Sequence, residues 1–291
     1  MKIGLALGAG GVRAFSHIGA IRALEDSGIP IDAISGTSMA SFVGALYAAT
    51  KDIEYVEYLA VQNHWPTLLR IMSEFSFRHG LFNGNHVKRT IEKALKGATF
   101  DDLLIPFAAA ATDLHSGKTI HIINGIVSDA VFASSAVPAL FQPIKKDAML
   151  LVDGGVSSPI PVESARSLGA DIVIAIDPVP EHDVCETHKQ DGIFEVLNHS
   201  LTVINYLVSR QELRSADAVI HTDCSSVVWT DIFSPEKIKR VIQIGEISAI
   251  RHIDAIKEKI RIAQNPFATF GQSVRYWLNR SYNYVNPSMP S

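Results

Sequence analysis

The chain has 291 residues, of which 47% are hydrophobic and 19% are charged, and this composition excludes disordered and fibrous proteins. Its 26 basic and 30 acidic residues give a net charge of -4, so we expect no nucleic acid as a partner. Two cysteines are too few for a disulfide framework, and no apolar stretch reaches the roughly 18 residues of a membrane span, which predicts a cytoplasmic globular protein.

Short apolar segments alternate with longer amphipathic segments, and this order predicts an α/β fold. The first predicted helix ends at Gly28, which can adopt the left-handed conformation of a helix end. A Ser-Pro-Glu sequence from Ser234 is typical of a helix start. Strands are predicted at 2–7, 31–35, 106–112, 119–123, 149–152, 172–176 and 218–221, and helices at 13–27, 39–50, 85–96, 161–168, 193–215 and 234–260.

The domain organisation follows from the absence of internal repeats and low-complexity linkers in the sequence. We expect one domain over residues 1–260, a three-layer α/β/α sandwich with a mainly parallel central sheet. Residues 180–192 are polar and are predicted to form a loop. Residues 261–291 contain arginines and aromatic residues but no acid, so this extension is expected either to pack on the domain or to contact the inner face of a membrane peripherally.

A glycine-rich turn, with Gly8, Gly10 and Gly11, follows the first predicted strand. Such a turn lets backbone amides approach a negative oxygen, and the start of the next helix adds positive potential. The turn does not match the dinucleotide-binding fingerprint, because Arg13 replaces its third glycine and no acid ends the second strand. A glycine turn required only for packing is the alternative interpretation.

Arg13 is unusual because a cation in the first turn of a helix opposes the helix dipole by roughly 0.3–1 kcal/mol. We therefore expect Arg13 to have an anionic or carbonyl partner. A phosphate head group of a ligand and a carbonyl or carboxylate of the protein are equally compatible with the sequence.

The second motif is Gly-Thr-Ser-Met-Ala at residues 36–40, between a predicted strand and a predicted helix. A nucleophile elbow has this form, with a sharp turn that exposes the serine oxygen at the edge of the sheet. Gly36 permits the close approach, and Ser38 is the candidate nucleophile. The alternative is a serine that only caps the following helix.

The third motif is Asp-Gly-Gly, which directly follows the strand predicted at 149–152. Asp153 is the candidate base, and Gly154 belongs to the same turn. An aspartate that only opens a turn is the alternative. Because the carboxyl ends of parallel strands share one edge of a sheet, we expect Asp153, Ser38 and the glycine-rich turn to converge there.

Together these motifs resemble those of bacterial patatin-like phospholipases. The likeness extends over residues 1–260 and also includes segments 133–138 and 161–177 and Phe141. It implies a Ser-Asp dyad in which Ser38 is the nucleophile and Asp153 the base, with an oxyanion hole at Gly10 and Gly11. The implied substrate is a phospholipid or lysophospholipid ester, cleaved through an acyl-enzyme without a metal or organic cofactor.

The sequence departs from that family at Ala14 and Ala40, where glycine is usual. The methyl group of Ala40 is expected to open the elbow slightly and to lower efficiency. An acyltransferase with the same site and a weakly catalytic protein that binds lipids to regulate a partner remain alternatives. The sequence gives no indication of the oligomeric state.

Three further features of the sequence concern a catalytic triad, a metal site and an acyl groove. A Ser-His-Asp triad could use one of the later histidines, but too few strands precede Ser38 for an α/β-hydrolase. His182, Cys185 and His188 lie in a polar segment without a clear fourth ligand, so we expect no metal site. Segments 130–141 and 65–82 are candidates for walls of an acyl groove, and the latter also for a lid.

Overall fold

A computed structural model describes residues 1–62, 84–179 and 193–264 of the chain. The chain divides into two compact units, Met1–His252 and Ile253–Ser291. Of the second unit, only the end of the last helix belongs to the described residues. The domain boundary expected at residue 260 therefore stays a prediction.

The described residues contain one mixed sheet of eight strands in the order β5-β6-β3-β2-β1-β7-β8, with β4 paired to β3. Strands β1, β2, β3, β7 and β8 run parallel, whereas β4 and β6 are antiparallel to β3 and β5 is antiparallel to β6. The mainly parallel sheet predicted from the sequence is thus confirmed. The strands are β1 (Ile3–Leu7), β2 (Ala33–Thr37), β3 (Phe107–Asp113), β4 (Thr119–Ile122), β5 (Ile144–Lys146), β6 (Met149–Asp153), β7 (Ile172–Asp177) and β8 (Ala218–His221).

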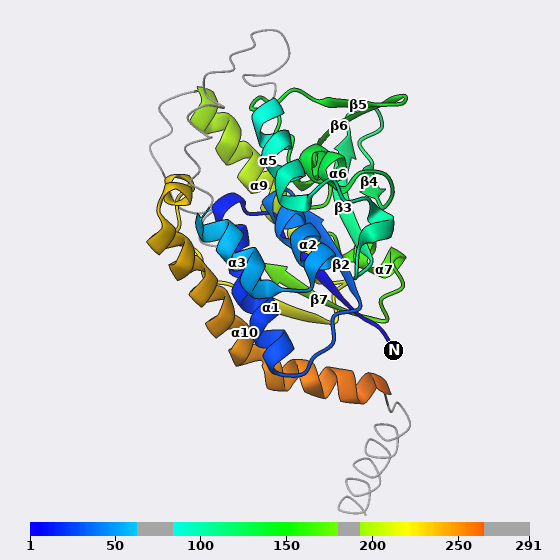
Figure 1. Cartoon of the computed structure of the whole chain (residues 1–291), viewed down its shortest axis with the longest axis vertical. Helices are drawn as coiled ribbons and strands as arrows, with labels where there is room; N and C mark the ends of the chain where they lie inside the picture. Colours follow the sequence, from blue (N-terminus) through cyan, green and yellow to red (C-terminus); the bar gives the residue numbers. More distant parts are fainter. Residues whose placement is uncertain (63–83, 180–192, 265–291) are drawn as a thin grey trace, which may run out of the picture. The chain divides into compact units, whose positions relative to one another are not determined.

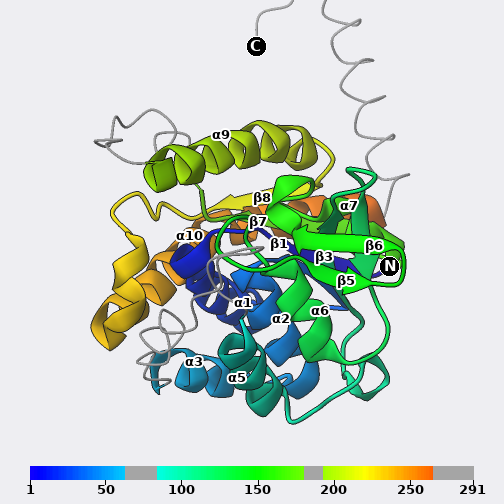
Figure 2. The same ribbon diagram turned by 90° about the horizontal axis from the view of Figure 1, so that it is seen from above.

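Helices cover both faces of the sheet and form the predicted three layers (Figures 1 and 2). Helices α1, α2 and α6 lie on one face with α3 and α5 outside them, and α7 and α9 lie on the other. The helices are α1 (Ser16–Asp26), α2 (Met39–Thr50), α3 (Ile53–Gln62), α5 (Asn85–Leu95), α6 (Val127–Ser134), α7 (Val162–Ser167), α9 (Ile193–Leu213) and α10 (Pro235–Gln264), with short 3-10 turns η1 (Gly11–Phe15), η2 (Phe100–Asp102), η3 (Gly154–Val156) and η4 (Trp229–Phe233). No helix in these described ranges is long and apolar enough to cross a bilayer.

The core strands are buried along their whole length. Every residue of β1, β2, β3 and β7 is buried. A parallel strand covered on both faces needs apolar or small side chains throughout, and the Phe-Ala-Ala-Ala-Ala sequence of β3 meets that requirement. This continuous apolar character is the reason why the strands could be located from the sequence.

Among the described residues, two α-helices and one strand were not predicted from the sequence: α3, α6 and β5. Strand β5 is a short sheet edge that pairs only with β6 among the described strands, and Lys145 and Lys146 give it the charged character of an exposed edge. The first predicted helix, at 13–27, begins instead with the 3-10 turn η1 before α1.

Strands β2 and β6 share one edge of β3. Strand β4 pairs with residues 109–112 of β3, and β2 and β6 pair with some of the same residues. Since each residue of β3 has one neighbour on either side, β4 occupies one edge of β3 and both β2 and β6 occupy the other. On the shared edge, Thr37 of β2 is opposite Ala110 and Asp153 of β6 is opposite Ala111. Because β6 is antiparallel to β3 and β2 is parallel to it, the carboxyl ends of β2 and β6 approach each other head to head.

Candidate active site

Ser38 lies in the sharp turn between β2 and α2. Its φ of 58° and ψ of -134° are strained for a residue with a side chain, and such strain is concentrated at functional sites. The amide and the hydroxyl of Ser41 both donate to Ser38 O, at 2.9 and 2.6 Å. A Cβ at Gly36 would lie 2.7 Å from Ser41 Cα, so this close approach requires glycine. The turn therefore has the geometry of a nucleophile elbow.

The Ser38 backbone is also fixed from α6. Ser38 N donates to Ser134 Oγ at 2.9 Å, and Ser134 Oγ in turn donates to Ala110 O at 2.6 Å. Ser134 is fully buried, so these bonds are made away from water. The sequence analysis gave Ser134 no role, because α6 itself was not predicted.

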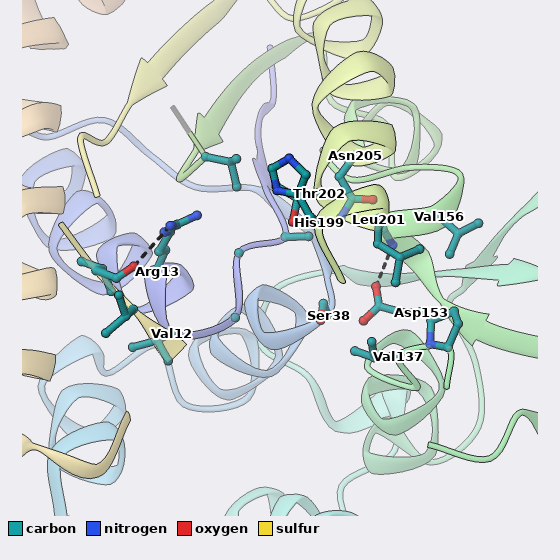
Figure 3. A pocket seen from close by; sticks show the side chains of 18 residues that line it. Val12, Arg13, Ser38, Val137, Asp153, Val156, His199, Leu201, Thr202 and Asn205 are labelled. Carbon is teal, nitrogen blue, oxygen red and sulfur yellow. Dashed lines mark hydrogen bonds between the residues drawn. The ribbon is translucent and has the colours of Figure 1, made fainter. Parts of the chain in front are cut away.

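Asp153 is the last residue of β6 and is 5% exposed. Burial raises the pKa of Asp153 to about 6, and hydrogen bonds from the Ser38 hydroxyl and the Gly155 amide oppose this rise. The bond from Gly155 N to Asp153 Oδ1 is 2.7 Å long (Figure 3). The carboxyl group is therefore a stronger base than an exposed aspartate, and the Ser38 hydroxyl is near enough to lower its pKa.

Gly154 allows the two strand ends to meet. A Cβ at this position would lie 2.2 Å from Ala110 O and 3.0 Å from Thr37 Cγ2. Either contact is shorter than ordinary packing permits, and the first is with backbone. The glycine of the Asp-Gly-Gly motif is therefore required by the junction of β2, β3 and β6.

The glycine-rich turn after β1 is held from three sides. Gly8 N donates to Ile176 O at 3.0 Å, and Ala9 N donates to Pro159 O at 2.8 Å. Burial lowers the pKa of His17 to about 4, so its ring is neutral, and Nε2 donates to Gly8 O at 2.8 Å. These bonds set the position of Gly10 and Gly11, whose φ values are -178° and 54°.

Gly11 begins the 3-10 turn η1, and the first amides of a helix have no acceptor within that helix. Gly10 and Gly11 line the same cavity as Ser38 and Asp153. An oxyanion hole formed by their amides stays a prediction.

A cavity of about 400 Å³ connects these groups (Figure 3). It brings together every turn that the sequence singled out: the glycine-rich turn with Arg13, the elbow and the Asp-Gly-Gly turn. Val137 and Pro138, from the segment predicted as a groove wall, line it as well. The lining is formed by Ala9, Gly10, Gly11, Val12, Arg13, Ser38, Val137, Pro138, Asp153, Gly155, Val156, Val179, His199, Leu201, Thr202, Asn205, Val227 and Val228.

Arg13 lines the cavity and donates from Nη2 to Val227 O at 3.2 Å. A carbonyl of the protein was one of the two partners expected for this cation, and the structure contains that contact. In Figure 3 the Arg13 side chain lies well apart from Ser38 and Asp153. An anion contact at Arg13 stays a prediction.

Helix α9 supplies four residues of the cavity lining, His199, Leu201, Thr202 and Asn205. The sequence analysis considered His199 only as a histidine of the disfavoured triad and missed the other three. With its amide nitrogen facing Gly155, Asn205 donates to Gly155 O at 2.5 Å. The available signal was the spacing of three residues between His199, Thr202 and Asn205, which places them on one face of the helix.

Of the described histidines, only His199 lines the cavity. His221 contacts Asp177 through Nδ1 at 3.2 Å, and His252 contacts Ser248 O. Segment 65–82 and the trio His182, Cys185 and His188 lie outside the described residues. Ala40 is fully buried, and its effect on efficiency stays a prediction.

Known proteins with similar sequences share these motifs' part of the chain. The patatin-like phospholipase family model matches residues 5–166. An uncharacterized NTE family protein of Mycobacterium tuberculosis is 33% identical over 181 residues, which are 60% of this chain and 48% of that protein. Human patatin-like phospholipase domain-containing protein 6 is 35% identical over 182 residues, 60% of this chain and 13% of that protein.

Lysophospholipase NTE1 of Coccidioides immitis is 33% identical over 179 residues, which are 60% of this chain and 11% of that protein. The chain thus spans about half the length of the mycobacterial relative and much less of the others. The solved structure of VipD from Legionella pneumophila has the same fold, with a TM-score of 0.50 and 12% identity over 87% of this chain and 66% of that chain. Since the family model covers more than half of the residues, the chain belongs to the patatin-like phospholipase family.

Proposed function

We propose that the protein is a lipid acyl hydrolase that cleaves carboxylic esters of phospholipids or lysophospholipids. The observation that carries this proposal is that Ser38, in a strained elbow, and the buried carboxyl group of Asp153 line one cavity together with the glycine-rich turn. The names of the relatives agree with it, because they include a lysophospholipase and patatin-like phospholipases.

In the proposed reaction, Ser38 Oγ attacks the ester carbonyl carbon while its proton moves to Asp153. The carbonyl oxygen becomes negative, and in this mechanism the amides of Gly10 and Gly11 donate to it; one such donor is worth roughly 2.7–4 kcal/mol in other hydrolases. Asp153 then gives the proton to the departing alcohol, which leaves an acyl group on Ser38. Water, deprotonated by Asp153, releases the fatty acid and restores the serine.

The raised pKa of Asp153 matters for this mechanism. An exposed aspartate is a poor base for an alcohol, because the two pKa values differ by many units. At a pKa of about 6, Asp153 is still ionised near neutral pH and accepts a proton more readily. Ser38 and Asp153 line the same cavity, and the interaction with the Ser38 hydroxyl lowers the pKa of Asp153.

Two variants and one control test the dyad. Labelling of Ser38 by a fluorophosphonate and hydrolysis of a soluble short-chain ester should both be lost in Ser38→Ala. Asp153→Asn should lower hydrolysis by about a thousand-fold or more, since the base is removed. His199→Gln is the matched control, because His199 lines the same cavity, and it should keep most of the activity. A folded His199→Gln protein without activity would contradict the dyad.

The same experiment separates the alternatives. Hydrolysis that gives way to transfer when an alcohol or thiol is added would identify an acyltransferase. A correctly folded protein that neither reacts with fluorophosphonate nor hydrolyses any ester would favour a lipid-binding regulator.

We also propose a cytoplasmic location with peripheral contact to the inner membrane face. The basic, aromatic composition of residues 261–291 supports this proposal. Deletion of that extension should weaken binding to anionic vesicles more than binding to neutral ones. Equal partitioning of the full chain onto both kinds of vesicle, unchanged by the deletion, would contradict a role of the extension.

A further inference from the structure

Helix α9 turns polar side chains towards the domain and apolar side chains outward, the reverse of the usual arrangement in a surface helix. A surface helix normally buries an apolar stripe and exposes polar side chains. In α9 the inward side is polar: Thr202 and Asn205 line the cavity and Ser209 is buried. Glu212 also faces inward, where its carboxylate accepts from Ser158 Oγ at 2.5 Å and from Ile160 N at 2.7 Å. The side of α9 that contacts the domain is therefore rich in hydrogen-bonding groups.

The outward side of α9 has three large exposed apolar side chains, beside exposed Ser200 and Gln211. Val196, Ile204 and Leu207 are 47%, 43% and 63% exposed. Their separations of eight and three residues place them on one face of the helix. We call these three residues, together with Arg210 and with Arg214, which directly follows the helix, the outer face of α9.

The charges on the outer face all have one sign. Arg210 and Arg214 are both exposed: Arg210 lies on the helix three residues after Leu207, and Arg214 directly follows Leu213, the last residue of α9. Between residues 196 and 214 the sequence has a single acidic residue, Glu212, and it is bonded on the inward side. An exposed apolar stripe that ends in cations is complementary to a surface that is apolar below and anionic above, as a phospholipid bilayer is.

We propose that the outer face of α9 docks on the surface of an anionic phospholipid bilayer. A helix of this kind lies in the plane of the interface with its apolar side chains among the acyl chains and its cations beside the phosphates. The opposite side of α9 forms a wall of the cavity that contains Ser38. Docking would therefore bring the bilayer within about one helix diameter, roughly 10–12 Å, of the cavity lining. An effect of docking on lipid hydrolysis rests on the proposed function, whereas the docking itself can be measured as vesicle binding, without catalysis.

Paired variants with matched controls test this proposal on the full chain. Ile204→Gln/Leu207→Gln removes apolar contacts, and Arg210→Gln/Arg214→Gln removes charge. For the apolar pair, the control is Ile247→Gln/Ile250→Gln on α10, where the two side chains are 51% and 57% exposed. For the charged pair, the control is Lys239→Gln/Arg240→Gln, which removes two exposed cations from α10.

Binding is measured by co-sedimentation with phosphatidylcholine vesicles, either alone or with about 30% phosphatidylglycerol. The wild-type protein should bind the anionic vesicles more strongly. Each outer-face variant should weaken that binding by about ten-fold, and neither control should change it by more than about two-fold. Hydrolysis of a soluble short-chain ester should be unchanged in the outer-face variants, while hydrolysis of vesicle phospholipid should fall with binding.

Four results would overturn the proposal: no binding of the wild-type protein to anionic vesicles, unchanged binding in the outer-face variants, equal losses in the variants and their controls, or a change only in the oligomeric state. The last result would identify the outer face as a contact between copies of the chain. If Ile204→Gln/Leu207→Gln does not fold, vesicle binding of Arg210→Gln/Arg214→Gln tests the proposal by itself. Vesicle binding that depends on the outer face, in a protein that hydrolyses no ester, would support docking and contradict the proposed function.

Discussion

Ser38 and Asp153 meet because two strands of opposite direction end against consecutive residues of β3. Ser38 follows Thr37, which is opposite Ala110, and Asp153 is opposite Ala111 on the same edge. The sequence analysis expected the two side chains to converge at the carboxyl ends of parallel strands. The side chains do converge, but β6 is antiparallel to β3, so the expected geometric reason is wrong.

The pH dependence of hydrolysis should follow the ionisation of Asp153. Because burial raises its pKa to about 6 and the proposed mechanism needs the ionised form, kcat/KM should fall about ten-fold per pH unit below pH 6 and level off above it. The measurement is the rate of hydrolysis of a soluble ester between about pH 4.5 and about pH 8.5, a range that extends to both sides of this pKa. Glu212→Gln is the control, and a midpoint that moves or disappears in this variant would contradict the assignment to Asp153.

Ser134→Ala should impair catalysis while leaving substrate binding intact. The substitution removes the acceptor of the Ser38 amide, and a buried amide without a partner costs about 1–3 kcal/mol. The elbow can relax to relieve that cost, so kcat should fall by about ten-fold or more with little change in KM. Ser128→Ala is the matched control, since Ser128 is also a buried serine of α6. Equal kcat values for the two variants would exclude the positioning role.

Gly154→Ala should both destabilise the protein and abolish hydrolysis. The new methyl group would lie 2.2 Å from Ala110 O, and relieving that clash must move β6 away from β2. Overpacking of this kind costs about 1–3 kcal/mol. Gly169→Ala is the control. Gly169 has a φ of 90° but open space around its Cβ position, so this variant introduces backbone strain without a steric clash. Thermal unfolding and the ester assay would distinguish the two effects, and an active Gly154→Ala protein would show that the strand junction tolerates a side chain.

Glu212 should make stability fall as pH rises. Burial raises its pKa to about 7, against the bonds from Ser158 and Ile160, so the folded protein holds a proton that the unfolded chain loses near pH 4.5. Stability is therefore lost between about pH 4.5 and pH 7, by at most about 3 kcal/mol.

Glu212→Gln cannot titrate, so its free energy of unfolding relative to wild type should increase from pH 5 to pH 8, as measured with urea. Exposed Glu163→Gln is the control and should show no such trend. A difference between Glu212→Gln and wild type that stays constant with pH would contradict the titration of Glu212 in this range.

The sequence by itself determined the features that depend on short segments. Apolar runs located the buried strands, because a strand covered on both faces has few polar positions. Glycines with serine or aspartate at strand ends located Ser38, Asp153 and the Gly10–Gly11 turn, because sharp turns and close backbone approach restrict which residues fit. These local requirements are visible without any knowledge of the partners.

Only the tertiary structure decided which segments meet and in which direction. The direction of β6, the contact of Ser134 with Ser38, and the packing of α9 over the cavity depend on residues far apart in the chain. The inward and outward sides of α9 are a clear case, because an amphipathic pattern alone favours burial of the apolar stripe. Here Asn205 and Glu212 have buried partners to bond with, and the energy of those bonds turns the polar side inward.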